Sequence, residues 1–196
     1  MRRCVRPPEP AVLRENAVRW TLAFAPGGAE LRWHRVENRP LNEHLLGPLR
    51  EMTASHCAYC DGFPLDVQAL STIDHFKPKS KFRDLAFAWQ NLYLVCSACN
   101  FWKRDHWDEA TLRPDDVGFD FLRYFIFDFA SGRIEPNPRS DSDSQRRAQA
   151  TIELLGLNRE GRPADRRRTL ERQRTPPLSD GDRDDRAYRF LWELGG

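Results

Sequence analysis

A chain of 196 residues has room for one decorated domain or two small ones, and its 40% hydrophobic and 31% charged residues are typical of a folded globular protein. A net charge of +2 excludes a nucleic-acid binder that works through overall charge, so such a function would require local basic patches. No apolar run approaches the roughly 18 residues of a membrane span, and the basic start lacks the apolar segment of a signal peptide. We therefore expect a cytoplasmic protein with no membrane partner.

The first part of the chain carries two helical patterns. Apolar residues recur at helical spacing over 11–24, and the sequence APGG at 25–28 ends that pattern. A second helix is expected from Asn42 to Met52, because its leucines fall on one face despite an internal Gly-Pro pair.

The middle of the chain alternates strand patterns with cysteine pairs. TIDHF (72–76) and NLYLVC (91–96) are short apolar runs, and each predicts a strand. NFWKRDHWDEA (100–110) predicts a short helix after the second cysteine pair. The predicted order is strand, loop, strand, cysteine turn and helix.

The last third predicts a hairpin and then helices. RYFIFDF and RIEP flank ASG within 119–135 and predict two paired strands. A helix is expected from a cap at Ser142 or Asp143 to Leu155, where a glycine stops it. ADRRRTLERQR (164–174) predicts a short basic helix.

Together these elements indicate an α+β protein. Proline, serine and glycine at 175–182 suggest a linker, and DRAYRFLWEL (185–194) suggests a terminal amphipathic helix. We divide the chain into an N-terminal helical extension, a core with the cysteines, a region of hairpin and helices, and a linker with its terminal helix: 1–55, 56–110, 111–175 and 176–196.

Four of the five cysteines form two CxxC pairs, Cys57/Cys60 and Cys96/Cys99. Cytoplasmic cysteines at this spacing indicate zinc ligands or redox sites rather than disulfides. The gap between the pairs exceeds the roughly 15–20 residues of a compact zinc ribbon and leaves room for a strand-loop-strand insert. We expect a closed, structural Zn²⁺ site that does not activate water. Four core cysteines without a metal remain the alternative.

The insert carries residues suited to acid-base and metal chemistry. His75 can be neutral at cell pH and accept a proton from water. Asp74 and Asn100 offer oxygen ligands for Mg²⁺ or Mn²⁺. Asn91, at the start of the second strand, can fix the direction of the imidazole. An Asp-His pair alone is usually structural, and Asn100 alone can be a helix cap; their order between two CxxC pairs favours a site.

Basic residues gather in the loop after His75 and beyond the second cysteine pair. They can contact phosphates, although a solvated loop explains them equally well. The predicted nucleic-acid contacts are Lys77, Lys79, Lys81, Arg83, Lys103 and Arg104. The aromatic residues Trp89, Phe101, Trp102 and Trp107 are interpreted as core packing in preference to base-stacking platforms.

The motifs CAYC, IDHFKPKS, WQNLYLVC and CSACNFWK, over about residues 56–104, resemble those of the HNH endonucleases, also called ββα-metal or His-Me finger nucleases. The resemblance implies a ββα-metal, treble-clef-like core with a four-cysteine structural zinc, flanked by helices and a hairpin. It implies His75 as general base, oriented by Asn91, and a catalytic Mg²⁺ or Mn²⁺ on Asp74 and Asn100. Lys103 would approach a phosphate. Asn100 stands where the family has His or Asn.

The flanks MRRCVRPPEPAVL and ATIELLGLNREGRPADRRRTLE resemble those of PtuB-type HNH nucleases of retron and Septu anti-phage systems. The flanks imply a defence nuclease that acts with an ABC/SMC-like ATPase. The HNH resemblance implies action on nucleic acid, with double-stranded DNA expected and weak sequence preference. The alternative is a non-catalytic, zinc-stabilised module that binds nucleic acid or protein. Such a module keeps the cysteines and the basic loop but has no need for Asp74 and His75 together.

Overall fold

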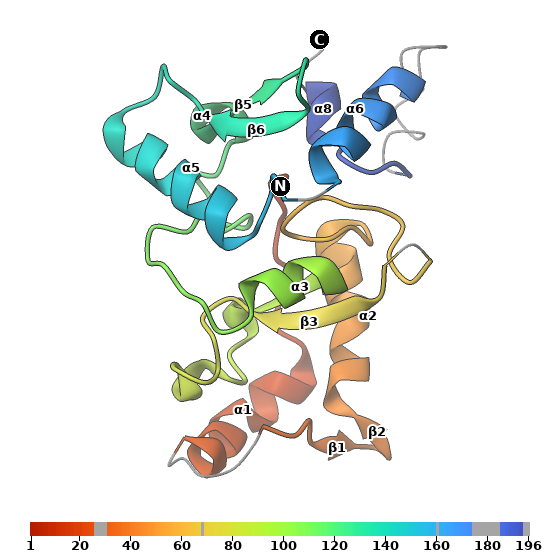
Figure 1. The fold of residues 1–196 in the computed structure, drawn as a ribbon. Helices are drawn as coiled ribbons and strands as arrows, with labels where there is room; N and C mark the ends of the chain where they lie inside the picture. The colour runs from red at the N-terminus through yellow and green to blue at the C-terminus, as the bar shows by residue number, and fades with distance from the viewer. Residues whose placement is uncertain (26–30, 68, 160, 174–184, 194–196) are drawn as a thin grey trace.

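The computed structural model describes residues 1–25, 31–67, 69–159, 161–173 and 185–193, and within them it combines helices with three two-stranded sheets. The predicted mixture of helices and strands is confirmed. Strand β3 and helix α3 lie at the middle of the molecule, between the N-terminal elements on one side and the C-terminal elements on the other (Figure 1).

An antiparallel strand pair followed by a helix forms the centre. β3 (Ser71–His75) pairs with β4 (Leu92–Cys96), and α3 (Ser97–Lys103) follows β4 directly. Every residue of β4 is buried, because α3 and the N-terminal helix α2 (Leu41–Thr53) both pack against it. The unbroken apolar sequence of β4 is typical of a strand covered on both faces.

The register of this pair separates the cysteines from the histidine. Cys96 lies opposite Ser71, whereas His75 lies opposite Leu92. Four residues of strand span about 13 Å, so the two groups occupy opposite ends of the strand pair. Helix α3 packs along β3 from the cysteine end of the strand pair toward the His75 end.

Both predicted N-terminal helices are present, as α1 (Ala11–Phe24) and α2. Helix α2 continues through Pro48, which removes one helical hydrogen bond, and its Leu45 and Leu49 are fully buried. Helix α1 packs against the 3₁₀ turn η1 (Arg83–Leu85). The short paired strands between the two helices are β1 and β2, at Arg35–Val36 and Arg39–Pro40.

The prediction of a helix over 100–110 is wrong at both ends. Helix α3 begins three residues earlier, capped by Cys96, whose Sγ accepts the backbone N–H of Cys99 at 3.4 Å. It ends at Lys103, because Arg104 has a φ of 47°, which cannot continue a right-handed helix. Arg104 therefore lies just beyond the helix.

The C-terminal hairpin is confirmed, as β5 (Phe125–Asp128) and β6 (Arg133–Pro136). The short helix α4 (Phe121–Tyr124) leads into β5, and α5 (Ser142–Leu154) packs across β6. These elements form the part of the molecule that lies beyond α3 (Figure 1).

The cap of α5 differs from the prediction by one or two residues. Asp141 is the N-cap, and its carboxylate accepts the backbone N–H of Ser144 at 2.8 Å. The predicted caps Ser142 and Asp143 lie inside the first turn instead. Asp, Ser and Asn cap helices about equally well, so residue type alone does not select among neighbours.

The end of the described chain returns to the centre. The basic helix is confirmed as α6 (Arg162–Gln173), and the short helix α8 (Phe190–Glu193) lies within the predicted terminal turn or helix. Before α8, Arg189 Nη2 donates to the buried carboxylate of Asp61 at 2.7 Å and to the carbonyl of Thr53 at 3.0 Å. The predicted linker at 175–182 lies outside the described residues.

A single hydrophobic cluster connects these parts, with members from Met1 to Leu191. Trp89 is 2% exposed and belongs to it, as the core interpretation expects, whereas Phe101 is 57% exposed, so the core interpretation is wrong for this residue. The division at residues 55, 110 and 175 remains a prediction. None of the helices in the described ranges is long and apolar enough to cross a bilayer.

Candidate active site and metal centre

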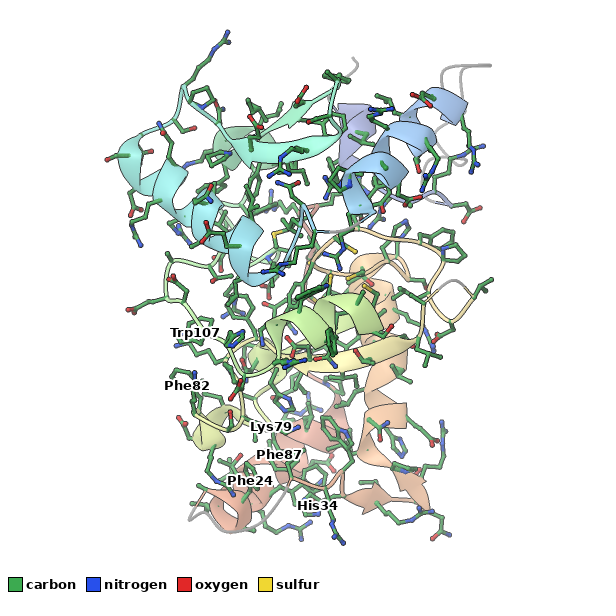
Figure 2. All side chains as sticks on the ribbon, viewed as in Figure 1. Phe24, His34, Lys79, Phe82, Phe87 and Trp107 are labelled. Carbon is green, nitrogen blue, oxygen red and sulfur yellow. The ribbon has the colours of Figure 1, made fainter. Side chains whose placement is uncertain are left out.

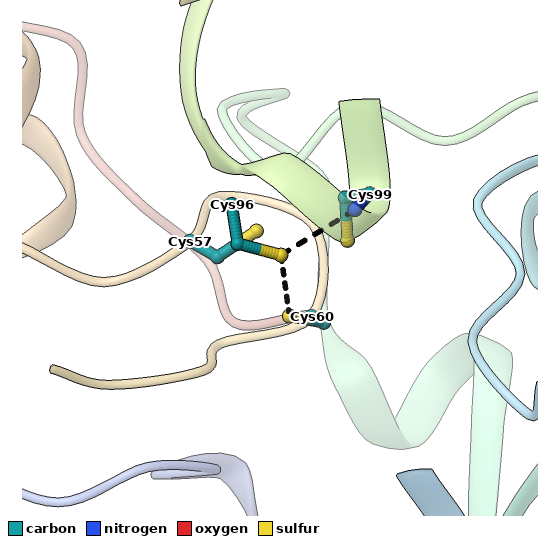
Figure 3. Close-up of side chains that lie close together, drawn as sticks. All are labelled: Cys57, Cys60, Cys96 and Cys99. Carbon is teal, nitrogen blue, oxygen red and sulfur yellow. Dashed lines mark hydrogen bonds between the residues drawn. The ribbon is translucent and has the colours of Figure 1, made fainter. Parts of the chain in front are cut away.

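Four buried cysteines meet where the first CxxC turn approaches the start of α3 (Figure 3). The Sγ atoms of Cys57, Cys60, Cys96 and Cys99 all lie within 4.8 Å of one another. The Sγ atoms of Cys60 and Cys96 are 3.9 Å apart, close to the about 3.8 Å that tetrahedral geometry gives for Zn–S bonds of about 2.3 Å. The cluster therefore fits a closed zinc site, as the two pairs predict.

The guanidinium group of Arg162 lies against this cluster. Its Nη2 donates to Cys99 Sγ at 3.2 Å, and its Nη1 donates to the carbonyls of Leu155 and Gly156. Burial by itself would lower the pKa of Arg162, but the charges of Cys99 and the other thiolates outweigh it and raise the pKa. Four thiolates around Zn²⁺ leave net negative charge, which this guanidinium offsets in part.

Arg162→Met is expected to weaken zinc binding by about 10- to 100-fold, because it removes a cation and a hydrogen bond from the thiolates. Competition with a chromogenic chelator measures the zinc affinity. Arg168→Met is the matched control, since Arg168 lies on the same helix with its side chain 58% exposed. Equal affinities of the two variants would contradict a role of Arg162 at the zinc site.

His75 is held with one ring nitrogen turned inward. Its Nε2 lies 2.9 Å from the carbonyl oxygen of Ala86 and donates to it, which places the proton on Nε2 and leaves Nδ1 as a lone pair. The Trp33 ring stacks on the imidazole with centroids 5.9 Å apart. Burial lowers the pKa of His75 to about 4, with a further contribution from Lys79, so the ring is neutral near pH 7.

Asp74 is buried and carries two hydrogen-bonding partners. Tyr59 Oη donates to its Oδ2 at 2.7 Å, and the Lys103 ammonium lies 3.0 Å from the same oxygen. Lys103 also donates to the carbonyl of His75 at 2.7 Å, and its side chain is fully buried. Burial raises the pKa of Asp74 and lowers that of Lys103. Lys103 was predicted to contact a phosphate, but in the structure its ammonium is buried and pairs with Asp74.

Asn91 braces the loop that holds His75. Its Oδ1 accepts the backbone N–H of Lys77 at 2.7 Å, and its Nδ2 donates to the carbonyls of Lys77 and Leu85. Leu85 precedes Ala86, whose carbonyl oxygen accepts the hydrogen bond from His75 Nε2. The contact between Asn91 and the imidazole is therefore indirect: it fixes the backbone that fixes the ring.

A cleft of about 290 Å³ brings Asp74, His75 and Asn100 together, with Lys79 and Arg104 also on its wall. The Asp-His pair shares this cleft because β3 ends at His75. Nδ2 of Asn100 donates to Thr72 Oγ1 at 3.1 Å, which leaves its Oδ1 as the oxygen suited to a cation. Asn100 comes from α3, the helix that the cysteines anchor.

Three of the predicted basic residues lie where a ligand can reach them. Lys79 and Arg104 line the cleft, and Lys81 is exposed on the same loop as Lys79. The pKa of His75 is lowered in part by the Lys79 charge, which shows that this ammonium acts on the cleft. These positions are compatible with the predicted phosphate contacts.

The other loop cations are engaged within the protein. Arg83 donates to the carbonyl of Phe24 at 2.7 and 3.1 Å and lies 3.6 Å over the Phe24 ring, so it braces α1 instead of facing a phosphate. The Lys77 ammonium lies 5.3 Å from the Phe82 ring and 5.4 Å from the Trp107 ring. Figure 2 shows Phe82 and Trp107 on one flank of the molecule, with Phe24 below them.

Sequence reasoning missed Tyr59, Trp33, Ala86 and Arg162. Tyr59 lies inside CAYC, so its place within the first cysteine turn was the available signal. Ala86 acts through its carbonyl oxygen, which no side-chain pattern can reveal. Arg162 contacts Cys99 from 63 residues along the chain, which no local motif predicts.

Comparison with known proteins gives a match in the central segment of the chain. No curated protein matches the chain. One segment of the chain matches a protein-family model. It runs from the first cysteine of the cluster to just beyond α3 and thus contains all four cysteines, Asp74, His75 and Asn100. Residues 57–105 match the family model described as HNH endonuclease.

Proposed function

We propose that the protein is a metal-dependent endonuclease that hydrolyses phosphodiester bonds of nucleic acid through a ββα-metal core. The observation that carries the proposal is the shared cleft of Asp74, His75 and Asn100. A neutral imidazole with a free Nδ1 lies there beside two oxygen donors, within a segment that matches HNH endonucleases. A general base and a cation site at one phosphate are the groups that this hydrolysis needs.

In the proposed reaction, Nδ1 of His75 takes a proton from a water molecule aimed at phosphorus. The Ala86 carbonyl holds the other ring nitrogen, so the imidazole keeps its tautomer and its direction while it gains charge. Asn91 holds the loop that carries Ala86. Lys79 and Arg104 bind the phosphate oxygens from the wall of the cleft.

The donor set fits a hard divalent cation, since Asp74 and Asn100 supply a carboxylate and an amide oxygen. Such an ion supplies positive charge for the phosphate and the leaving 3′-oxygen. The Lys103 ammonium balances the charge of the Asp74 carboxylate, and a bound ion would contact the same carboxylate.

Nicking of supercoiled plasmid by the purified full chain tests the proposal. We expect relaxed circles that appear with Mg²⁺ or Mn²⁺ and do not appear when no divalent ion is added to the zinc-loaded protein. Products with 5′-phosphate ends would agree with attack at phosphorus and departure of the 3′-oxygen. Failure to cut duplex, single-stranded DNA and RNA with either ion would refute a nuclease that acts without a partner.

A zinc-stabilised binding module is the second candidate, and one observation favours it. Lys103 already neutralises Asp74 inside the protein, as expected of a carboxylate with a purely structural role. In that case the four cysteines and the surface cations bind a ligand, and no divalent ion is needed at Asp74.

Lys103→Met separates the two candidates. Removal of one partner from this buried pair is expected to cost about 3–5 kcal/mol of unfolding free energy, because the Asp74 charge is left unpaired. For the nuclease, Mn²⁺ should restore part of that stability in urea unfolding. Lys81→Met, at an exposed lysine, should change neither the unfolding free energy nor its response to Mn²⁺. No response of Lys103→Met to Mn²⁺ would favour the binding module.

The finer parts of the proposal rest on the two resemblances: that to HNH nucleases for the substrate, and that of the flanking segments for the defence role and the partner. They are action on DNA with weak sequence preference, a role in anti-phage defence, and cooperation with an ABC/SMC-like ATPase. Co-purification of the native complex tests the ATPase: a stoichiometric ATPase that changes the rate of nicking would support it, and full nicking activity of a chain that binds no ATPase would count against it.

A further inference from the structure

A second cleft lies beside the candidate active site. It has a volume of about 480 Å³, within the roughly 300–1,000 Å³ of ligand pockets. Phe101, Trp102 and Trp107 line it from α3 and the segment after α3, and the end of α5 forms its other wall. The proposed hydrolysis has no use for this cleft.

The cleft combines aromatic rings with guanidinium groups. Phe101 is 57% exposed, and its ring lies 5.7 Å from that of Trp102. The Arg104 guanidinium lies 4.5 Å from the Phe101 ring centre, and that of Arg159 lies 4.2 Å from the Trp102 ring centre. Proteins hold unpaired bases on such rings and guanidinium planes.

The two clefts share one lining residue, and helix α3 contributes residues to both. Arg104 lines both of them. Residues three apart share a face of a helix, and Asn100 and Lys103 both bond to β3, so the neighbouring Phe101 turns to the second cleft. A nucleotide next to a phosphate bound in the first cleft would therefore have the Phe101 ring on the other side of Arg104.

The charges in the second cleft suit a base better than a phosphate. The two guanidinium groups share it with the carboxylates of Asp108 and Glu153. Asp108 also accepts the backbone N–H of Ala110 at 2.8 Å. Because positive and negative groups balance, a second backbone phosphate gains little there, whereas a ring face stacks with every base.

We propose that this cleft binds an unpaired nucleobase beside the scissile phosphodiester. The substrate class is then single-stranded nucleic acid, or a duplex with unpaired nucleotides at the cut, instead of the intact duplex expected from the resemblance. In an intact duplex each base is paired and stacked, and it reaches Phe101 only after it is extruded. This inference rests on the proposed nuclease function and assigns its substrate class.

Fluorescence anisotropy tests the inference with full-length His75→Ala protein, which keeps the labelled oligonucleotide intact. The probes are a single strand, its duplex, and that duplex with a short bulge. Phe101→Ala in this background should weaken binding of the single strand and the bulged duplex by about 5- to 100-fold and leave duplex binding unchanged. Phe129→Ala is the matched control, because Phe129 is 56% exposed on the distant hairpin end. Phe101→Leu keeps an apolar side chain without a ring and should behave like Phe101→Ala, whereas Phe101→Tyr should bind normally.

The outcomes distinguish this inference from the proposed function. If the protein nicks plasmid but neither its binding of the single strand nor its cutting depends on Phe101, the base-binding cleft is wrong and the nuclease function stands. Phe101-dependent binding of the single strand without any cutting keeps the cleft and removes the nuclease. If Phe101→Ala turns an oligomer into a monomer in size-exclusion chromatography and does not change oligonucleotide binding, the cleft is a protein contact and the inference is wrong.

Discussion

His75→Ala is expected to lower the rate of plasmid nicking by about 10²- to 10⁴-fold, the usual contribution of a general base. The reason is local, since the substitution removes the Nδ1 lone pair from a cleft that also holds Asp74 and Asn100. The cysteine cluster lies at the other end of the strand pair, so zinc content should stay the same. Single-turnover nicking and zinc analysis of the same preparation measure both effects.

His44→Ala is the matched control for this substitution. The ring of His44 also bonds a backbone carbonyl, that of Val36 at 3.0 Å, but it lies outside the cleft. Its nicking rate should equal that of the wild type. Added imidazole should restore part of the activity of His75→Ala, which a purely structural role of the ring would not allow. Equal nicking by His75→Ala and wild type would show that another group, or no group, acts as the base.

Cys96→Ser is expected to abolish zinc binding and the cooperative unfolding of the central segment. Structural zinc contributes about 10–16 kcal/mol to the folding of zinc-finger peptides, as much as the roughly 5–15 kcal/mol by which whole domains are stable. Serine can still cap α3 in place of Cys96, so the expected effect comes from the lost metal ligand at the start of the helix that carries Asn100. Zinc analysis and urea unfolding monitored by circular dichroism measure the two effects.

Cys4→Ser provides the comparison, because Cys4 is a free thiol outside the cluster. It should retain one equivalent of zinc and a wild-type unfolding curve. A chelator should reproduce the effect of Cys96→Ser on the wild-type protein. One equivalent of zinc and native circular dichroism in Cys96→Ser would rule out the four-cysteine site.

The elements with a clear hydrophobic period were predictable from the sequence. Helix α2 and the strands of the two longer strand pairs follow such patterns, and α1 has a weaker one. Helix α5 was expected from its capping residue and the glycine that stops it, and the CxxC spacing sufficed to bring the four cysteines together. The end of α3 was not predictable, because 100–110 has the composition of a helix and only the positive φ of Arg104 stops it. Tertiary contacts can override local propensity in this way.

The site was predictable in its motif residues and not in their partners. Asp74, His75 and Asn100 were predicted as a set, and they line one cleft. The ion pair of Lys103 with Asp74 joins residues 29 positions apart, and its burial depends on how α3 turns against β3. A lysine after a run of surface cations has the pattern of a phosphate ligand, and only packing distinguishes the two roles.

The ion pair of Arg189 with Asp61 has a consequence for the order in which the protein matures during synthesis. Asp61 directly follows Cys60, and its buried carboxylate bonds the side chain and the backbone N–H of Arg189. All four thiols of the cluster have been translated by residue 99, but Arg189, the partner of Asp61, is translated 90 codons later. Until then a negative charge beside the metal loop lacks its counterion. A nascent chain that stops between these two residues would thus carry a carboxylate beside the four cysteines without its arginine partner, and the later segment completes the surroundings of the cluster.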